Sequence, residues 1–413
     1  MQRNFVWLSC ASTLVLAQPC TAYAQNEDSA QITGLQDIVV TAQRREQNLQ
    51  DVPISITALD AGAIEANRIQ NIGDLGSLAP NTSVRKQAGG GNLPMFTIRG
   101  VSASNSAAET DNPVSVYIDG VYLGRAVGAI FDLADIERIE ILKGPQGTLF
   151  GRNSTGGAVS VTTADPSGVL GGKADFTIGN YGQRRARASL DLPEWNGFSL
   201  RLSVLHSERD GDIRNLGAGT RWDFTSRTNG KWGIRTSPKT LGAENTDAFR
   251  VALRYEAGDF DATYKFDFTD SISTGNGTTP IIGDPLGIIA SQPQSGINIT
   301  SKRPKAVNNA FTTPTEQRTT GHLFTINFKA SDVVSLKNIM SYRTNKLETS
   351  NQIDGAGGLI KNDLAAFYGS LGTAGVPGLE AFAGFNQGSI GDPILLLGIV
   401  NGTKNRQFTE EAQ

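Results

Sequence analysis

The feature that most constrains the fold is a series of stretches after residue 170 in which apolar and polar side chains alternate. At 249–255, for example, Phe249, Val251 and Leu253 alternate with Arg250 and Arg254. A period of two is typical of a β-strand with one apolar and one polar face. We expect such strands at 173–178, 185–192, 198–204, 249–255, 260–268, 322–329 and 334–343, with an eighth opening at 405–413.

The connections between these stretches alternate in length. Short links at 193–197, 256–259 and 330–333 alternate with much longer ones. Transmembrane β-barrels have this asymmetry, with tight turns on one side of the membrane and long loops on the other. A β-sandwich shows the same period with its apolar face inward, so the period alone leaves that alternative open. The connection lengths favour an antiparallel membrane barrel.

Composition excludes several classes of function. The net charge of the 413 residues is −3 and no basic stripe appears, so we expect no nucleic-acid partner. Only His206 and His322 could supply imidazole ligands, and neither a phosphate loop nor a Gly-x-Ser-x-Gly elbow is present. We therefore predict no metal site, no cofactor and no enzymatic activity. The apolar run at 394–400 is too short to span a membrane and is expected to be a packed loop.

The first 24 residues are predicted to be a signal peptide. Arg3 precedes the apolar run Phe5–Ala17, and small residues lead to a cleavage site after Ala24. Both cysteines, Cys10 and Cys20, lie in this segment, so we expect no disulfide in the mature chain.

Residues 51–165 have a mixed pattern that predicts a small α+β domain. We expect strands at 52–56, 96–99 and 140–143, a helix from the N-cap Asp60 to Ile69, helical pieces at 71–78 and 135–139, and a hairpin at 114–123 that turns on Asp119-Gly120.

Three segments carry a resemblance to a known family: Leu35–Ala42, Val114–Arg125 and Ile141–Val161. In this order, behind a signal peptide and ahead of alternating strands, they make the chain resemble a TonB-dependent outer-membrane receptor. The resemblance implies a membrane β-barrel of about 22 strands with an N-terminal α+β plug domain. Because eight strands enclose no domain, we expect a C-terminally incomplete chain. Its expected parts are a signal peptide at 1–24, a periplasmic segment at 25–50, the plug at 51–165 and a partial barrel at 166–413.

The resemblance also implies an energy-coupling segment, the TonB box. Its β-branched residues predict an extended strand without a partner in its own domain, which could add to the sheet edge of TonB. TonB would draw on the inner-membrane proton gradient through its partner complex. The alternative is a strand at the start of the plug itself. The predicted box is Asp37, Ile38, Val39, Val40, Thr41 and Ala42.

Charged residues of the plug are predicted to contact the barrel wall, where charge pairs add specificity more than stability. The alternative is ordinary solvated charge. The predicted contact residues are Arg99, Glu137, Arg138, Glu140, Lys143 and Arg152.

The expected function is active uptake of a scarce solute across the outer membrane. The first candidate for this solute is a ferric siderophore or a similar iron complex. The N-terminal segment would lie in the periplasm, and the expected contacts are TonB, outer-membrane lipid and the small ligand. A carbohydrate or cobalamin receptor is the alternative, and a passive porin or surface adhesin is the alternative of another class. Tyr181, Trp222 and Trp232, near the expected outer loops, suit stacking on sugars or aromatic chelates.

Overall fold

The computed structural model describes residues 39–40, 47–69, 72–86, 94–103, 111–124, 135–280, 287–297, 299–378, 389–392, 394 and 397–413. All of them belong to one compact unit that spans residues 38–413. The predicted signal peptide lies outside the described residues.

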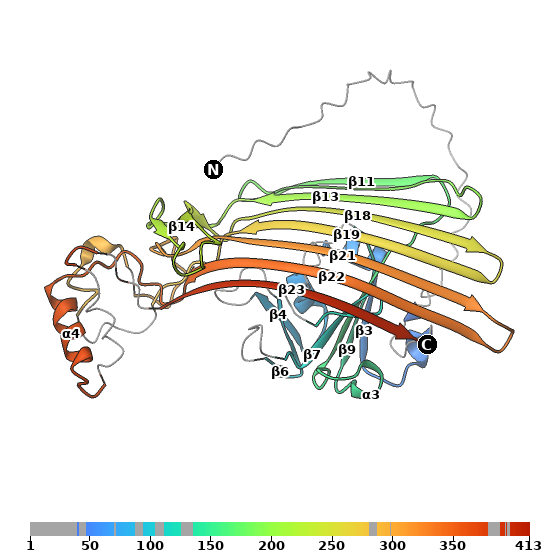
Figure 1. Ribbon diagram of the computed structural model, residues 1–413, viewed down its shortest axis with the longest axis horizontal. Coiled ribbons are helices and arrows are strands. Elements are labelled where there is room, and N and C mark those ends of the chain that lie inside the picture. The colour runs from blue at the N-terminus through green and yellow to red at the C-terminus, as the bar shows by residue number, and fades with distance from the viewer. Residues whose placement is uncertain are drawn as a thin grey trace, which may run out of the picture. The chain divides into compact units, whose positions relative to one another are not determined.

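Eight antiparallel strands form the largest sheet, each paired with its neighbour along the chain (Figure 1). They are β11 (Gly171–Ile178), β12 (Arg184–Asp191), β13 (Phe198–Arg209), β18 (Glu244–Ala257), β19 (Phe260–Ser273), β21 (Thr313–Lys329), β22 (Ser335–Gln352) and β23 (Gly398–Ala412). Every predicted strand is present. The later ones extend further towards the long loops, where polar residues hide the alternation. β23 begins at Gly398, so residues 398–400 are a strand and not the packed loop we expected.

The large sheet is apolar on its exposed face and polar on its covered face. Phe176 is 65% exposed and Phe249 40%, whereas Arg250 is 5% exposed and Ser203 2%. A sandwich would bury the apolar face instead. Apolar and polar side chains are therefore distributed over the two faces as in a lipid-facing barrel wall, and the β-sandwich alternative is wrong.

The plug domain is built on a mixed five-stranded sheet in the order β3-β9-β10-β7-β8, in which β10 and β7 are parallel. Its core includes Ile98, Ile141, Val159 and Val161, none of which is exposed. The strands are β3 (Ile56–Asp60), β7 (Val114–Ile118), β8 (Val121–Tyr122), β9 (Ile136–Lys143) and β10 (Gly157–Thr163), beside a second sheet of β4 (Thr82–Lys86), β5 (Pro94–Ile98) and β6 (Val101–Ser102).

Short helices complete the plug. Asp60 caps the first of them, accepting a hydrogen bond from the Ala63 amide at 2.7 Å, as predicted. The helices are α1 (Ala61–Ala66), α2 (Leu75–Leu78) and α3 (Gly147–Phe150), with 3-10 turns η1 (Leu49–Asp51) and η2 (Ile72–Asp74).

Two plug predictions need correction. The strand expected at 52–56 begins only at Ile56. Residues 136–139 are part of β9 and not helical, because that strand pairs on both sides, with β3 and with β10. Tertiary pairing overrides the charged, helix-like local sequence.

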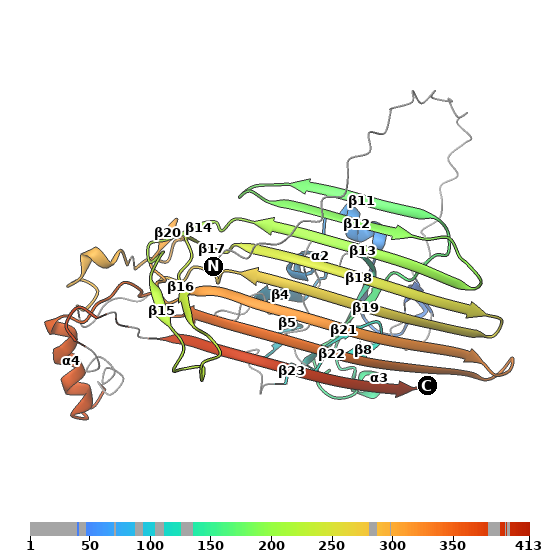
Figure 2. The ribbon, with the colours of Figure 1, turned by 45° about the horizontal axis from the view of Figure 1, so that its top comes forward.

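The plug lies against the polar face of the large sheet, on its concave side in Figure 1 and behind the sheet in the turned view of Figure 2. The short turns are at one end of the strands and the long connections at the other. The long connections carry β14 (Ile213–Asn215), β15 (Arg221–Asp223), β16 (Ile234–Thr236), β17 (Thr240–Leu241), β20 (Ala306–Val307), η4 (Pro293–Ser295) and α4 (Asp363–Thr373). Among the described residues, no helix has the length and apolar character needed to cross a membrane.

Candidate functional site

The contact between plug and sheet centres on the turn that joins β7 to β8. Asp119 and Gly120 both have positive φ, at 48° and 82°, the conformation of a type I′ turn, as predicted. This turn aims the Asp119 carboxylate at β10. The carboxylate accepts hydrogen bonds from the Thr163 amide at 2.8 Å and from the Thr163 hydroxyl at 2.5 Å.

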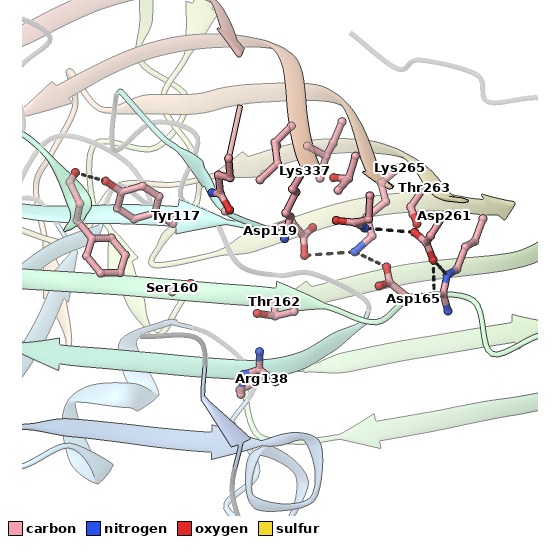
Figure 3. Close-up of a pocket in the computed structure, with 18 residues that line it drawn as sticks. Tyr117, Asp119, Arg138, Ser160, Thr162, Asp165, Asp261, Thr263, Lys265 and Lys337 are labelled. Carbon is pink, nitrogen blue, oxygen red and sulfur yellow. Dashed lines mark hydrogen bonds and ion pairs between the residues drawn. The ribbon is translucent and has the colours of Figure 1, made fainter. Parts of the chain in front are cut away.

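Two cations from the large sheet approach the same carboxylate. Lys265 of β19 places its Nζ 3.3 Å from Asp119 and 2.7 Å from Asp165, as Figure 3 shows. Arg250 of β18 lies 3.5 Å from Asp119 and donates to the Thr163 hydroxyl. We call these five residues the Asp119 cluster: Asp119, Thr163, Asp165, Arg250 and Lys265.

The Asp119 cluster is buried, with Arg250 5% and Lys265 8% exposed. Burial alone would raise the pKa of Asp119, but the Lys265 ammonium, the Arg250 guanidinium and the two Thr163 hydrogen bonds hold that pKa below its ordinary value. The carboxylate is therefore ionised at neutral pH and compensates the cations around it. A buried group of this kind fixes the register of two domains more than it stabilises them.

Other polar contacts join the plug to more distant strands. Asp135, just before β9, accepts hydrogen bonds from Arg201 at 2.8 Å and from Ser203 at 2.9 Å, both on β13. At the other side, Gln407 of β23 accepts from the Gly124 amide at 2.9 Å and donates to the Tyr122 carbonyl at 2.5 Å. Glu65 of α1 also pairs with Lys173 of β11. The plug is thus held by hydrogen bonds and ion pairs spread from β11 to β23.

A cavity of about 490 Å³ lies between the plug and the sheet beside the Asp119 cluster. Tyr117 and Arg138 of the plug, and Asp261 and Lys337 of the sheet, are among the residues that line it (Figure 3). Both signs of charge line the cavity, as in a wet interface that can part.

The structure places three of the six predicted contact residues near this cluster. Arg138 lines the cavity and donates to Glu140 at 2.7 Å, so this pair is internal to β9. Burial raises the pKa of Glu137, an effect that the Arg138 charge opposes and the Asp165 and Asp119 charges reinforce.

The other three lie around the start of β10. Arg99 lies against Gly144, with its Nη1 3.1 Å from the position that a Cβ on Gly144 would take. Burial lowers the pKa of Lys143, and the charge of Arg99 lowers it further. Arg152 is exposed. That these residues seal the plug against the wall stays a prediction.

Sequence reasoning missed the Asp119 cluster itself. One signal was available, because Arg250 and Lys265 lie on the polar faces of predicted strands and Asp119 sits at a predicted turn. What the sequence lacks is the register that brings Asp119 and Lys265 together.

Only two residues of the predicted TonB box, Val39 and Val40, are described; Asp37, Ile38, Thr41 and Ala42 are not. They form β1 (Val39–Val40), which pairs with β2 (Gln47–Asn48). Val40 is fully buried in a cluster that includes Val52, Leu142 and Phe150. The expectation that this strand lacks a partner in its own domain is therefore wrong for these two residues.

The three aromatic residues proposed for stacking differ in exposure. Tyr181 is 52% exposed, with the Arg209 guanidinium 5.1 Å from its ring centre. Trp222 donates to the Ala310 carbonyl at 2.7 Å. Trp232 is only 3% exposed and packs on Phe224, so its predicted availability for stacking is wrong in this structure.

Among the described residues, no group of three or more His, Cys, Asp or Glu side chains is arranged to hold a metal ion. The described groups at this contact are ion pairs and hydrogen bonds between plug and sheet. A plug on the polar face of an outward-apolar antiparallel sheet defines the fold class: a membrane β-barrel with a plug domain.

Comparison with known proteins identifies the family of the plug domain. Residues 48–158 match the TonB-dependent Receptor Plug Domain. The chain is 29% identical over 195 residues to the vitamin B12 transporter BtuB of Vibrio vulnificus, covering 46% of this chain and 31% of that protein. It is 28% identical over 216 residues to the pesticin receptor of Yersinia pestis, covering 50% of this chain and 30% of that protein.

Solved structures share the fold. The ferric yersiniabactin uptake receptor FyuA from Yersinia pestis has a TM-score of 0.56 at 17% identity, covering 72% of this chain and 42% of that one. The ferripyoverdine receptor of the outer membrane of Pseudomonas aeruginosa has a TM-score of 0.58 at 16% identity, covering 79% and 38%. The matched domain is the plug of TonB-dependent receptors, and the chain spans about a third of the length of the curated relatives that it matches.

Proposed function

We propose that this chain forms the plug and part of the barrel of an outer-membrane receptor that imports an iron chelate of the ferric siderophore class, driven by TonB. The role needs binding and transport and no covalent step. The observation that carries it is the plug held by a buried charge cluster on the polar side of a sheet whose other side is apolar and exposed.

Insertion in a membrane accounts for the exposed apolar face. Lipid would cover side chains such as Phe249 and Leu253, which water would otherwise surround. The short turns would then face the periplasm and the long connections the outside. This orientation puts the end of the plug that bears β1 and β2 within reach of a periplasmic partner.

Energy coupling is assigned to residues 37–42. Their β-branched sequence suits addition to the edge of a TonB sheet. Pairing with TonB requires that Val40 leave its buried place, so the coupling strand has two alternative partners, the plug and TonB. Substrate binding would bias that choice, and traction would then shift part of the plug.

The substrate class rests on the relatives. FyuA is described as a ferric yersiniabactin uptake receptor, and a second neighbour binds ferripyoverdine. Cobalamin is the second candidate, favoured by the match to a vitamin B12 transporter.

The test is uptake by the full-length protein in a Gram-negative strain that lacks its own receptors. Radiolabelled ferric siderophores and cobalamin are supplied in parallel, with and without an uncoupler of the proton gradient. We expect uptake of an iron chelate that stops with the uncoupler, while binding at the cell surface persists. Uptake that the uncoupler leaves unchanged would refute active transport, and uptake of cobalamin alone would refute the substrate class.

A variant isolates the coupling strand. Val39→Pro removes a ladder donor and should abolish uptake while it leaves surface binding intact. Val39→Ile, which keeps both the donor and the β-branched side chain, is the matched control and should transport normally.

A further inference from the structure

One row of residues on the covered face of the large sheet joins the Asp119 cluster to a second ion pair. The members of this row are directly opposite one another on five adjacent strands. Each of these strands is paired on both sides, so the row lies inside the sheet and away from its edges. We call it the Arg250 row: Ser203 of β13, Arg250 of β18, Asp267 of β19, Gly321 of β21 and Arg343 of β22.

The second ion pair crosses the strand that lies between its partners. Arg343 donates to both carboxylate oxygens of Asp267, at 2.9 and 2.8 Å, across β21. A Cβ on Gly321 would overlap both side chains, so the pair forms because residue 321 has no side chain. Asp267 is the wall acid directly opposite Arg250, and Arg343 already holds both of its oxygens. Arg250 therefore relies on the plug for a compensating charge.

The plug satisfies Arg250 only in part. Its Nη2 lies 3.5 Å from Asp119 and donates to the Thr163 hydroxyl. Its Nη1 is buried and has no hydrogen-bond partner among the described residues, and the whole residue is only 5% exposed. Two hydrogen bonds from Thr163 hold the Asp119 carboxylate, which therefore meets the guanidinium at one nitrogen. A carboxylate that is free of the turn would accept from both nitrogens, in the parallel geometry that suits an arginine fork.

Two cavities adjoin these cations. Arg250, Lys265 and Arg343 line a small cavity of about 10 Å³, which has room for about one water molecule. Lys265 also lines the cavity of about 490 Å³ (Figure 3). That cavity reaches Arg254 and Asp261, on either side of the short turn between β18 and β19. The cations thus lie at the head of a polar space that continues towards the short turns.

We propose that Arg250 and Lys265 form a carboxylate-binding subsite of the barrel wall, which a carboxylate group of the imported chelate occupies when the plug shifts. This rests on the proposed function, in which traction moves part of the plug. When the turn at Asp119 moves, Arg250 is left beside an acid that another arginine holds, and a buried cation without a partner is strongly unfavourable. A carboxylate on the solute restores the lost pair. The substrate class narrows to ferric chelates that carry free carboxylate groups.

Other occupants fit the subsite less well. A neutral chelate brings no charge to Arg250. Chloride has a single centre and cannot accept from two guanidinium nitrogens in the parallel geometry of a carboxylate. Water that follows the moving plug is the remaining alternative, and the experiment separates it from a carboxylate.

The experiment supplies the carboxylate as a separate molecule. In Asp119→Gly the turn is kept, because glycine readily adopts the φ of 48° at this position, and the space of the lost side chain is open to acetate. Hydrogen exchange of the Thr163 amide is followed in the full-length protein in a non-ionic detergent. We expect faster exchange than in the wild type, and acetate at about ten times its Kd should slow it about tenfold, because it binds only the closed contact. Chloride and acetamide, the neutral isostere, should have no effect at the same concentration.

Further variants are matched controls. Asp119→Gly/Arg250→Gln should not respond to acetate, and neither should Asp119→Asn, whose amide fills the space. Asp119→Gly/Arg318→Gln, which removes an arginine that is 47% exposed on the outer face, should respond as Asp119→Gly does. If exchange in Asp119→Gly is too fast to measure, Asp119→Ala with formate makes the same test, since only the carboxylate is then replaced.

Three results would overturn the inference: no effect of acetate in Asp119→Gly, an equal effect of acetamide or chloride, or a response that persists in Asp119→Gly/Arg250→Gln. Energised uptake of ferric chelates is measured as well. Arg250→Gln should lower uptake of chelates with free carboxylates and leave surface binding intact; unchanged uptake would also overturn the subsite. If acetate has no effect while the wild type still imports a chelate, the subsite alone is wrong. If acetate acts while the wild type imports no chelate, the proposed function is wrong and the carboxylate site stands.

Discussion

Replacing Asp119 with Asn tests whether the Asp119 cluster anchors the plug to the sheet. The change keeps the shape of the side chain but removes the charge that compensates Arg250 and Lys265, both nearly buried. Breaking a buried pair from one side costs about 3–5 kcal/mol because the other charge stays buried without its partner. Lys265 keeps Asp165 at 2.7 Å, so we expect the lower end, about 3 kcal/mol.

The assay is hydrogen exchange of the full-length protein in detergent, followed by mass spectrometry of peptides from β7 and β10. A loss of about 3 kcal/mol corresponds to opening of the contact that is more than 100-fold more frequent. The amide of Thr163, which donates to Asp119 at 2.8 Å, should lose the most protection. Asp332→Asn, which removes an acid that is 97% exposed in a surface pair, is the control and should change nothing measurable.

A second variant separates the lost charge pair from general damage. In Asp119→Asn/Lys265→Met, one of the two stranded cations is also gone, so part of the lost protection should return. Unchanged exchange at Thr163 in Asp119→Asn would refute the anchoring role. So would a double variant whose loss is the sum of two independent losses.

Three further predictions follow from single features. The pKa of Asp119 is lower in the folded protein than the unfolded value of about 3.9. Its contribution to stability is therefore full above about pH 4 and is lost as the pH falls through the folded pKa. The hydrogen-exchange rate of the Thr163 amide, corrected for the intrinsic rate, should be constant from pH 7 to 5 and rise only below pH 4. Gly157→Ala should destabilise the plug by about 1–3 kcal/mol in urea unfolding, because Gly157 has a φ of 151° and a Cβ would overlap the Leu142 carbonyl oxygen. The control Gly147→Ala, at a position with open space around it, should be neutral or slightly stabilising. Val40→Asp should release β1, because it removes about 1.5–3 kcal/mol of stabilisation from the burial of the Val40 side chain. Trypsin should then cleave after Arg44 and Arg45 faster than in the control Asp51→Asn, which changes an exposed residue. Equal cleavage rates would contradict the packing of β1 on the plug.

The strands of the large sheet could be predicted because one face of each must be apolar and the other polar along its whole length. Phe249 and Arg250 already identify the two faces of β18, and the exposure of Phe249 confirms which one is turned away from the plug. The hairpin at Asp119-Gly120 could be predicted for a local reason as well, since few dipeptides adopt two positive φ angles.

What the sequence could not supply is register over long separations. The pair of Asp119 and Lys265 joins residues 146 positions apart, and a slip of one residue in β19 would turn Lys265 to the apolar face. The same holds for β9, where the local sequence at 136–139 suggested a helix until pairing on both edges is taken into account. The burial of Val40 could not be predicted, because its packing partners Leu142 and Phe150 are about a hundred residues away and the sequence near Val40 does not indicate them.

The hairpin of β1 and β2 has a mechanical consequence. Val39 is opposite Asn48, so the end of β1 that leads towards the N-terminus lies beside the end of β2 that leads into the plug. A force applied on the N-terminal side of Val39 therefore acts on one end of the β1–β2 ladder. The hydrogen bonds between the two strands then break one after another, as in a zipper, and not all at once. A pull from the N-terminal side therefore separates β1 from β2 and draws Val40 away from its contacts with Leu142 and Phe150.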